Sequence, residues 1–486
     1  MINFSGLEFI FRFLPVFMII YWIIPSTYRD AFLFVGSLVF YASGAKWFTL
    51  LLLGLVFVNY LFGELVWVMP GRRRKTQQRQ MLIAIVVIDA VVLIVFKVLA
   101  LKVKSTLLPL GLSFYIFKMI SYQADLYLEK MHKRPSFMQA AAYFTMFPQI
   151  AQGPIMRFTQ GWIEKPTNIR RRTVYMERAV SLQKIEDGLS FFVIGLGMKV
   201  LIADRLGILW NEIVKIGFES ISTPLAWLGA VGYSLELYFD FWGYSLMAGG
   251  IGLMLGFRFI QNFIHPYAAC GIADFYRRWH ATLGSWFRDY VYIPLGGSRC
   301  SSAAVIRNLM IVWLLTGFWH GGTLNFIIWG LALGLMIVWE KFVVKDLIRR
   351  VPLIGHLHVI ILEKFVAGGL IRKIPVIGHL LVIFFIPLTW VIFAITDLKE
   401  LGMYFTRLFP FFGTGVAVNR GDFGKYIGIY WPFLAAGVLL CVPVFYNLLV
   451  WKRKNPLVIA LLLVIFWVSV YFASISAGNP FMYFSF

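Results

Sequence analysis

The sequence predicts an all-α, multi-pass membrane protein. Hydrophobic residues make up 60% of its 486 residues and charged residues only 14%. A water-soluble chain of this length cannot cover its surface with so few polar groups. Many apolar stretches reach about 18 residues, the length that an α-helix needs to cross roughly 30 Å of hydrocarbon. The 17 Trp and 22 Tyr residues suit the headgroup level of a bilayer.

We expect one integral membrane domain over residues 1–486. The first apolar stretch, Leu7–Ile24, lacks a basic segment before it and a small-residue cleavage site, so it predicts a retained span rather than a signal peptide. The stretch 225–256 is too long for one straight crossing, and its glycines would let it tilt or break. The apolar stretches are 8–24, 31–43, 46–68, 81–101, 107–127, 138–156, 189–203, 225–256, 305–319, 324–344, 376–396, 431–450 and 456–475.

The net charge of +22 comes from basic residues that cluster in short loops between apolar stretches, such as 71–80 and 170–178. The positive-inside rule explains such loops on the cytoplasmic side, and it argues against a nucleic-acid partner. The same cations could bind an anionic cosubstrate. Three widely spaced cysteines without a CxxC motif indicate neither a disulfide framework nor a metal site.

Polar side chains inside apolar stretches are costly at membrane depth, so each needs a partner, a water-filled cavity or a function. Tyr233, Glu236, Asp240 and Tyr244 fall at helical spacing on one face. Two carboxylates one turn apart repel each other in a low dielectric. Either this face bonds to an Arg or Lys of another helix, or it lines a reaction cavity.

The segment 272–299 is dense in Arg and aromatic residues and too polar to cross the membrane. It predicts an amphipathic helix at the membrane face, with Trp and Tyr in the interface. Its arginines would face water, phosphates or acidic partners. The arginines in and just after this segment are Arg277, Arg278, Arg288, Arg299 and Arg307.

His320 ends an apolar run and precedes two glycines. A lone histidine in apolar surroundings is usually a core residue, but a neutral imidazole at a helix end can take a proton from a hydroxyl. The chain has no GxSxG, GxxxxGK[ST] or HExxH motif. These absences exclude a triad hydrolase, a P-loop enzyme and a zinc protease of the usual kinds.

Several motifs distributed over nearly the whole chain carry a family likeness. They are Pro109–Tyr115, Phe147–Ile155, Lys199–Asp204, Tyr238–Tyr244, Met254–Arg258, Arg277–Gly297, Gly317–Gly321 and Asn479–Phe484. Together they resemble the membrane-bound O-acyltransferase family, and within it the bacterial alginate O-acetyltransferase branch.

The resemblance implies a ring of about 11–13 transmembrane or re-entrant helices around a central pore or funnel, with a catalytic region at about 107–330. It implies that His320 is the catalytic histidine and general base, and that His280 is the second important histidine. Supporting residues are expected at Asp240, Tyr244, Trp319 and Asn325.

The resemblance also implies acetyl-CoA as a cytoplasmic cosubstrate, with no permanently bound cofactor and no metal. The acetyl group would pass to a hydroxyl of an exopolysaccharide or cell-wall polymer, or to an extracytoplasmic SGNH-type acetyltransferase partner. Such a protein lies in the bacterial cytoplasmic (inner) membrane. The five arginines of 277–307 are the expected contacts of coenzyme A.

A thioester is already activated, so the reaction needs only a base for the acceptor hydroxyl and alignment of two substrates. His280 would either orient the acceptor or polarise the thioester carbonyl. Three other functions stay open: D-alanyl transfer from a carrier protein to teichoic acid, a transporter or flippase for a polysaccharide or lipid intermediate, and a non-catalytic scaffold.

Overall fold

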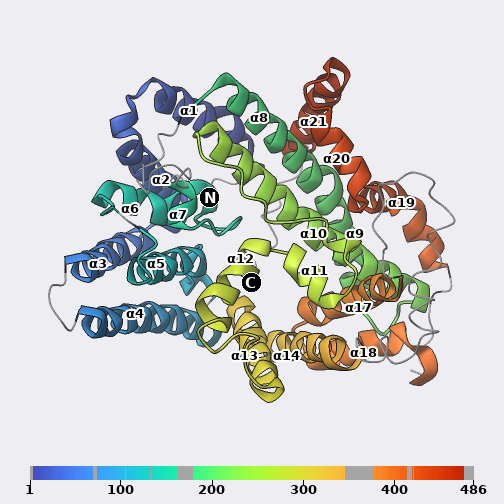
Figure 1. The fold of residues 1–486 in the computed structure, drawn as a ribbon. Helices are drawn as coiled ribbons and strands as arrows, with labels where there is room; N and C mark the ends of the chain where they lie inside the picture. Colours follow the sequence, from blue (N-terminus) through green and yellow to red (C-terminus); the bar gives the residue numbers. More distant parts are fainter. Residues whose placement is uncertain are drawn as a thin grey trace, which may run out of the picture. The chain divides into compact units, whose positions relative to one another are not determined.

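A computed structural model describes residues 4–68, 74–103, 105–131, 133–162, 179–344, 376–412, 419 and 421–475. The basic loop 170–178 and the motif Asn479–Phe484 lie outside this range. Every regular element in the described residues is helical (Figure 1), which confirms the all-α fold class. The ring around a pore and the single membrane domain stay predictions.

The chain divides into two compact units, and the first comprises residues 1–196, 243–261 and 465–485. Two long helices, α10 (Thr223–Met254) and α21 (Pro456–Ile475), contribute residues to both units. The other helices of the first unit are α1 (Leu14–Ile23), α2 (Arg29–Ala45), α3 (Phe48–Val68), α4 (Arg74–Lys102), α5 (Leu112–Tyr127), α6 (Phe137–Thr145), α7 (Phe158–Gly161) and α8 (Leu182–Gly197).

Polar side chains inside the first unit bond to one another, as helices in a membrane require. The buried Asn59 of α3 donates through Nδ2 to Oδ1 of Asp89 at 3.0 Å. Gln123 of α5 donates through Nε2 to the carbonyl oxygen of Asn59 at 2.6 Å. These bonds join the three helices α3, α4 and α5 through buried polar side chains.

The second unit comprises residues 197–242 and 262–464. Its remaining elements are η5 (Met198–Ala203), α9 (Asp204–Ile216), η6 (Pro266–Ala268), α11 (Ile272–Arg278), α12 (Ala281–Phe287), η7 (Arg288–Tyr292), α13 (Ser302–His320), α14 (Leu324–Trp339), η8 (Glu340–Val344), α17 (Val376–Ala394), α18 (Leu398–Leu408), α19 (Asp422–Cys441) and α20 (Pro443–Trp451).

Helices α13 and α14 lie side by side in this unit (Figure 1), joined by the short turn 321–323. Their contact is made by glycines. A Cβ on Gly330 would lie 2.5 Å from the carbonyl oxygen of Trp313, and a Cβ on Gly317 would lie 2.4 Å from that of Phe326. The backbones therefore touch, and this contact fixes the end of α13 where His320 stands.

Among the described residues, six helices are long and apolar enough to cross a membrane. They are Phe48–Val68, Arg74–Lys102, Ser302–His320, Leu324–Val344, Asp422–Cys441 and Pro456–Ile475. The prediction for 225–256 left a break open, but α10 runs unbroken for 32 residues. One of its glycines serves close packing instead, because a Cβ on Gly250 would lie 2.4 Å from the carbonyl oxygen of Gly188 in α8.

Three predicted stretches are divided in the structure. The stretch 138–156 is helical only to Thr145, followed by the single turn Phe147–Gln149, where Pro148 interrupts the backbone hydrogen bonds. The stretch 431–450 is divided before Pro443 for the same reason. The predicted amphipathic helix of 272–299 is two short helices and a π-helical turn, because His280 leaves the helical conformation between α11 and α12.

Candidate active site

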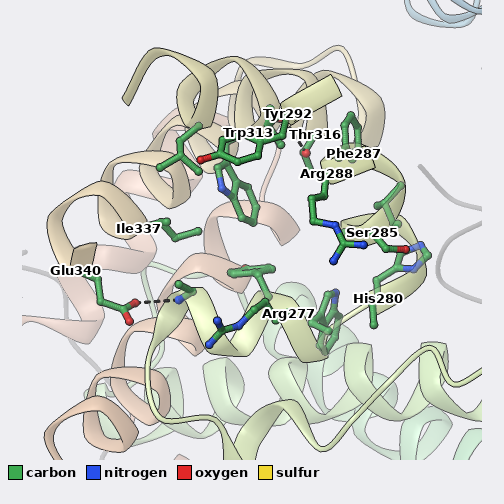
Figure 2. Close-up of a pocket in the computed structure, with 18 of the residues that line it drawn as sticks. Arg277, His280, Ser285, Phe287, Arg288, Tyr292, Trp313, Thr316, Ile337 and Glu340 are labelled. Atoms are coloured by element: carbon green, nitrogen blue, oxygen red, sulfur yellow. Dashed lines mark hydrogen bonds between the residues drawn. The ribbon is translucent and has the colours of Figure 1, made fainter. Parts of the chain in front are cut away.

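A cavity of about 640 Å³ lies in the second unit, among α11, α12, η7, α13, α14 and η8. Both candidate histidines, His280 and His320, line it. Its walls are mainly aromatic and aliphatic, including Trp313, Trp329 and Ile337. Figure 2 shows the side chain of Arg288 extending into the cavity from η7. The cavity therefore combines an apolar wall with a few polar groups, as small-molecule sites usually do.

His320 is the last residue of α13, and Gly321 after it is extended. The imidazole meets two aromatic rings edge to face, that of Trp329 at 5.0 Å and that of Phe393 at 5.0 Å between centroids. The ring of the preceding residue, Trp319, has its centroid 4.5 Å from that of His320. Aromatic packing from α14 and α17 therefore sets the orientation of this ring at the cavity wall.

Asn325 stands at the start of α14 and is fully buried. Its Nδ2 donates to the carbonyl oxygens of Ile392 and Phe393, at 3.2 and 3.1 Å. These bonds fasten α14 to the end of α17, beside the Phe393 ring that packs on His320. Asn325 thus bonds to the backbone of Phe393, whose ring packs on His320. Asn325 itself does not line the cavity.

His280 links α11 to α12 in a left-handed backbone conformation, with φ of +43°. This conformation is uncommon outside glycine and clusters at functional sites. Its Nδ1 lies 2.9 Å from Oδ1 of Asn262, and its ring meets the Phe241 ring edge to face at 4.6 Å. Burial lowers the pKa of His280 to about 3, so the imidazole is neutral at pH 7.

The structure separates the five predicted arginines. Arg277 and Arg288 line the cavity. Ion pairing does not distinguish them, because Arg277 and Arg278 both pair with Asp274, at 3.0 and 2.9 Å, and Arg288 pairs with Asp289 at 2.7 Å. Arg307 donates to Asn308 and to the carbonyl oxygen of Leu295. The arginines that do not line the cavity are Arg278, Arg299 and Arg307.

The predicted polar face of α10 was expected either to bond to a cation of another helix or to line a cavity. The structure shows the first for Asp240. Lys199 of η5 places Nζ 2.6 Å from Oδ1 of Asp240 and 2.7 Å from Oδ1 of Asp204. Asp240 thus pairs with a buried lysine and does not line the cavity. Tyr244 does not line it either: this residue belongs to the first unit, where its ring stacks on Phe4 at 4.8 Å.

Sequence reasoning missed several residues that the fold brings to the site. Lys341 and Glu340 of η8 line the cavity, and Glu340 accepts a hydrogen bond from the backbone N–H of Ala273 at 2.8 Å (Figure 2). Asn262 and Thr282 bond to each other beside His280. Glu340 and Lys341 stand near the end of the apolar stretch 324–344, where charged residues are common at the membrane interface. The sequence therefore provides no reason to assign them to a site.

Comparison with known proteins decides the family. Residues 37–367 match the membrane-bound O-acyltransferase family. The chain belongs to this family. The predicted resemblance is therefore confirmed, and membership together with the six apolar helices makes the chain a multi-pass membrane protein.

Relatives within and around this family differ in the group they transfer. The chain is 38% identical to a probable alginate O-acetylase of Pseudomonas syringae pv. tomato, over 70% of this chain and 66% of that protein. It is 33% identical to a peptidoglycan O-acetyltransferase of Helicobacter pylori, over 68% of each. It is 26% identical to a teichoic acid D-alanyltransferase of Bacillus subtilis, over 49% of this chain and 60% of that protein. The match to the alginate relative thus spans just under two thirds of that protein's length.

Proposed function

We propose that this chain is a membrane O-acetyltransferase that moves an acetyl group from acetyl-CoA to a hydroxyl of an exopolysaccharide or cell-wall polymer. The observation that carries the proposal is the cavity, which two histidines and three cationic side chains line in a chain of this family. The 38% and 33% identities to an alginate and a peptidoglycan O-acetyltransferase favour acetyl as the group transferred.

In the proposed reaction, Nε2 or Nδ1 of His320 takes the proton of the acceptor hydroxyl as its oxygen attacks the thioester carbonyl carbon. A C–O bond forms, the C–S bond breaks, and the thiolate of coenzyme A leaves. The imidazolium then returns its proton to the thiolate, so that an ester and a free thiol result. General-base assistance of this kind contributes about 10²- to 10⁴-fold to a rate.

The cations at the cavity support binding of the donor. Coenzyme A carries phosphates, which Arg binds through paired N–H donors and Lys binds as a point charge. Arg277, Arg288 and Lys341 line the cavity. The aromatic wall would hold the acyl chain and pantetheine arm away from water, which strengthens the electrostatic contacts within.

The proposed acceptor follows from the activities of the alginate and peptidoglycan relatives. A polymer outside the cytoplasm would receive the acetyl group directly, or through an extracytoplasmic SGNH-type acetyltransferase partner. The proposed location is the bacterial cytoplasmic (inner) membrane, with the thioester supplied from the cytoplasm. The membrane then separates the two substrates, and the cavity is where they meet.

Donor choice tests this proposal directly. Purified protein in proteoliposomes is given acetyl-CoA or a D-alanyl carrier protein, each with a soluble alginate or peptidoglycan acceptor, and thiol release and ester formation are measured. We expect acceptor-dependent release of coenzyme A thiol and an acetyl ester. Ester formation only from the D-alanyl carrier protein would contradict acetyl transfer and identify the chain as a D-alanyltransferase. Transport of polymer without ester formation would favour a transporter.

The cavity arginines predict a difference in donor affinity. Arg288→Ala should raise KM for acetyl-CoA by about 10- to 150-fold, because a hydrogen bond to a charged group is worth roughly 1.5–3 kcal/mol. Arg299→Ala removes the same charge from the same polar segment, outside the cavity lining, and should leave KM near the wild-type value. Equal effects of the two variants would show that net charge, rather than a contact in the cavity, governs donor binding.

A further inference from the structure

The hydrogen bonds around His280 converge on one oxygen atom. Oδ1 of Asn262 lies 2.9 Å from Nδ1 of His280 and accepts from the hydroxyl of Thr282 at 2.7 Å. All three residues are buried, with His280 3%, Asn262 2% and Thr282 8% exposed. An amide oxygen only accepts hydrogen bonds, so Nδ1 of His280 must carry the proton of this bond.

Backbone hydrogen bonds hold this arrangement in place. The N–H of Ala281 donates to the carbonyl oxygen of Asn262 at 2.8 Å, and the N–H of Ile264 donates to that of Arg278 at 3.0 Å. The segment 262–264 is thereby fastened alongside 278–281. The left-handed conformation of His280, with φ of +43°, lies between these two bonds and turns the imidazole toward Asn262.

The position of the proton decides what the other ring nitrogen can do. A neutral imidazole carries one N–H, so with the proton on Nδ1 the lone pair is on Nε2. A lone pair accepts a hydrogen bond from a hydroxyl, whereas a thioester carbonyl oxygen is itself an acceptor and needs a donor. Of the two roles considered for His280, this tautomer permits orientation of the acceptor hydroxyl and excludes polarisation of the carbonyl.

We propose that Asn262 is a positioning residue that fixes His280 in the Nδ1–H tautomer, so that Nε2 of His280 orients the acceptor hydroxyl for attack. This proposal rests on the proposed O-acyl transfer at the cavity, and it names the side of the reaction that His280 serves. His320 remains the base, and the two histidines divide deprotonation and orientation between them.

Burial favours the neutral form of the His280 ring, and the charged groups of the cavity are partly paired with one another. The cavity that His280 lines also contains the cations Arg277, Arg288 and Lys341, the carboxylate of Glu340 and the imidazole of His320. Arg277 pairs with Asp274 and Arg288 with Asp289, so the charges of these two cations are offset beside them. Glu340 is held by the backbone N–H of Ala273.

The test compares two substitutions of Asn262 by steady-state kinetics with acetyl-CoA and a soluble acceptor. Asn262→Leu removes the accepting oxygen. We expect KM for the acceptor to rise by about tenfold, because one hydrogen bond of about 1 kcal/mol and the tautomer preference are lost together. KM for acetyl-CoA should stay unchanged. Asn262→Asp keeps an accepting oxygen at this position and should retain transfer at high pH.

The pH profile separates positioning from a structural role. The carboxylate of Asn262→Asp favours the charged imidazolium, whose Nε2 donates instead of accepting. The acid limb of kcat/KM for the acceptor should therefore move to higher pH relative to wild type. An Asn262→Asp variant that is inactive at every pH, with Asn262→Leu active, would require the opposite tautomer and overturn the proposal.

The chain offers a matched control in a second asparagine–histidine pair. Nε2 of His265 lies 3.2 Å from Oδ1 of Asn447, and His265 is also buried and left-handed, with φ of +49°. Neither residue lines the cavity. Asn447→Leu should leave both KM values unchanged, and an equal rise in acceptor KM would show a general packing effect and overturn the assignment. If wild type forms no ester, the proposed function fails; if wild type forms ester and Asn262→Leu behaves like wild type, only the positioning role fails.

Discussion

His320→Asn should reduce acetyl transfer by about 10²- to 10⁴-fold, the contribution of a general base, while the protein still folds and inserts. Asparagine keeps polar atoms near the aromatic rings of Trp329 and Phe393 but cannot take a proton from the acceptor hydroxyl. Ester formation from acetyl-CoA by purified protein in proteoliposomes measures the loss. Size-exclusion elution and the thermal midpoint show whether the fold is intact.

The matched control for this variant is His379→Gln. His379 lies in α17, where its Nδ1 is 3.1 Å from the carbonyl oxygen of Ala269, and it does not line the cavity. Glutamine can still donate a hydrogen bond there, so transfer should continue at the wild-type rate. Wild-type transfer by His320→Asn would contradict the assignment of His320 as base.

Gly330→Val should destabilise the protein by about 1–3 kcal/mol, the usual cost of overpacking, and abolish transfer. A Cβ at this position lies 2.5 Å from the carbonyl oxygen of Trp313 and 3.1 Å from Cα of Gly317, and backbone atoms cannot turn aside as a side chain can. The helices α13 and α14 would have to separate, which displaces His320 at the end of α13. The thermal midpoint in detergent and the transfer rate measure the two effects.

Gly428→Val is the matched control, since this glycine also lies inside a helix, α19, but its Cβ would meet nothing within 4 Å. Glycine and valine differ by only a few tenths of a kcal/mol in helix propensity, so the steric contact accounts for the difference between the variants. Equal thermal midpoints of Gly330→Val and Gly428→Val would show that the glycine contact between α13 and α14 is not tight.

Much of the fold was predictable because apolar length and helix formation are coupled in a membrane. The errors occur where one residue ends a helix without changing the hydropathy. Pro443 divides the stretch 431–450, and His280 divides the polar segment 272–299 by adopting positive φ. A hydropathy pattern contains no information on either backbone conformation.

The two histidines of the candidate site could be predicted from the sequence, but most of the residues around them could not. His280 and His320 belong to recognisable motifs, and the structure places both at one cavity. Which arginine reaches that cavity depends on the turn at His280, so Arg277 and Arg288 could not be separated from Arg299 beforehand. Asn262 meets His280 across 18 positions of chain, through a contact that only the folded loop creates.

The partner of Asp240 shows the same limit. Helical spacing placed its carboxylate on one face with Glu236, and both a cation and a reaction cavity could explain that face. Lys199 supplies the cation, with Nζ between Asp204 and Asp240. A buried ion pair of this kind offsets part of the cost of placing each charge in a low dielectric. Removing one partner destabilises the fold by about 3–5 kcal/mol, because the other charge stays buried without compensation.

The most direct test of the central claim asks whether acetyl-CoA occupies the cavity that contains His280 and His320. Ser285 lines this cavity (Figure 2), whereas the exposed Cys300 does not. In Ser285→Cys, the rate of modification by a small thiol reagent is measured at both cysteines by peptide mass spectrometry, with and without acetyl-CoA. Binding in the cavity predicts that acetyl-CoA slows modification at position 285 and leaves Cys300 unaffected. Unchanged modification at position 285, in protein that still transfers acetyl groups, would contradict it.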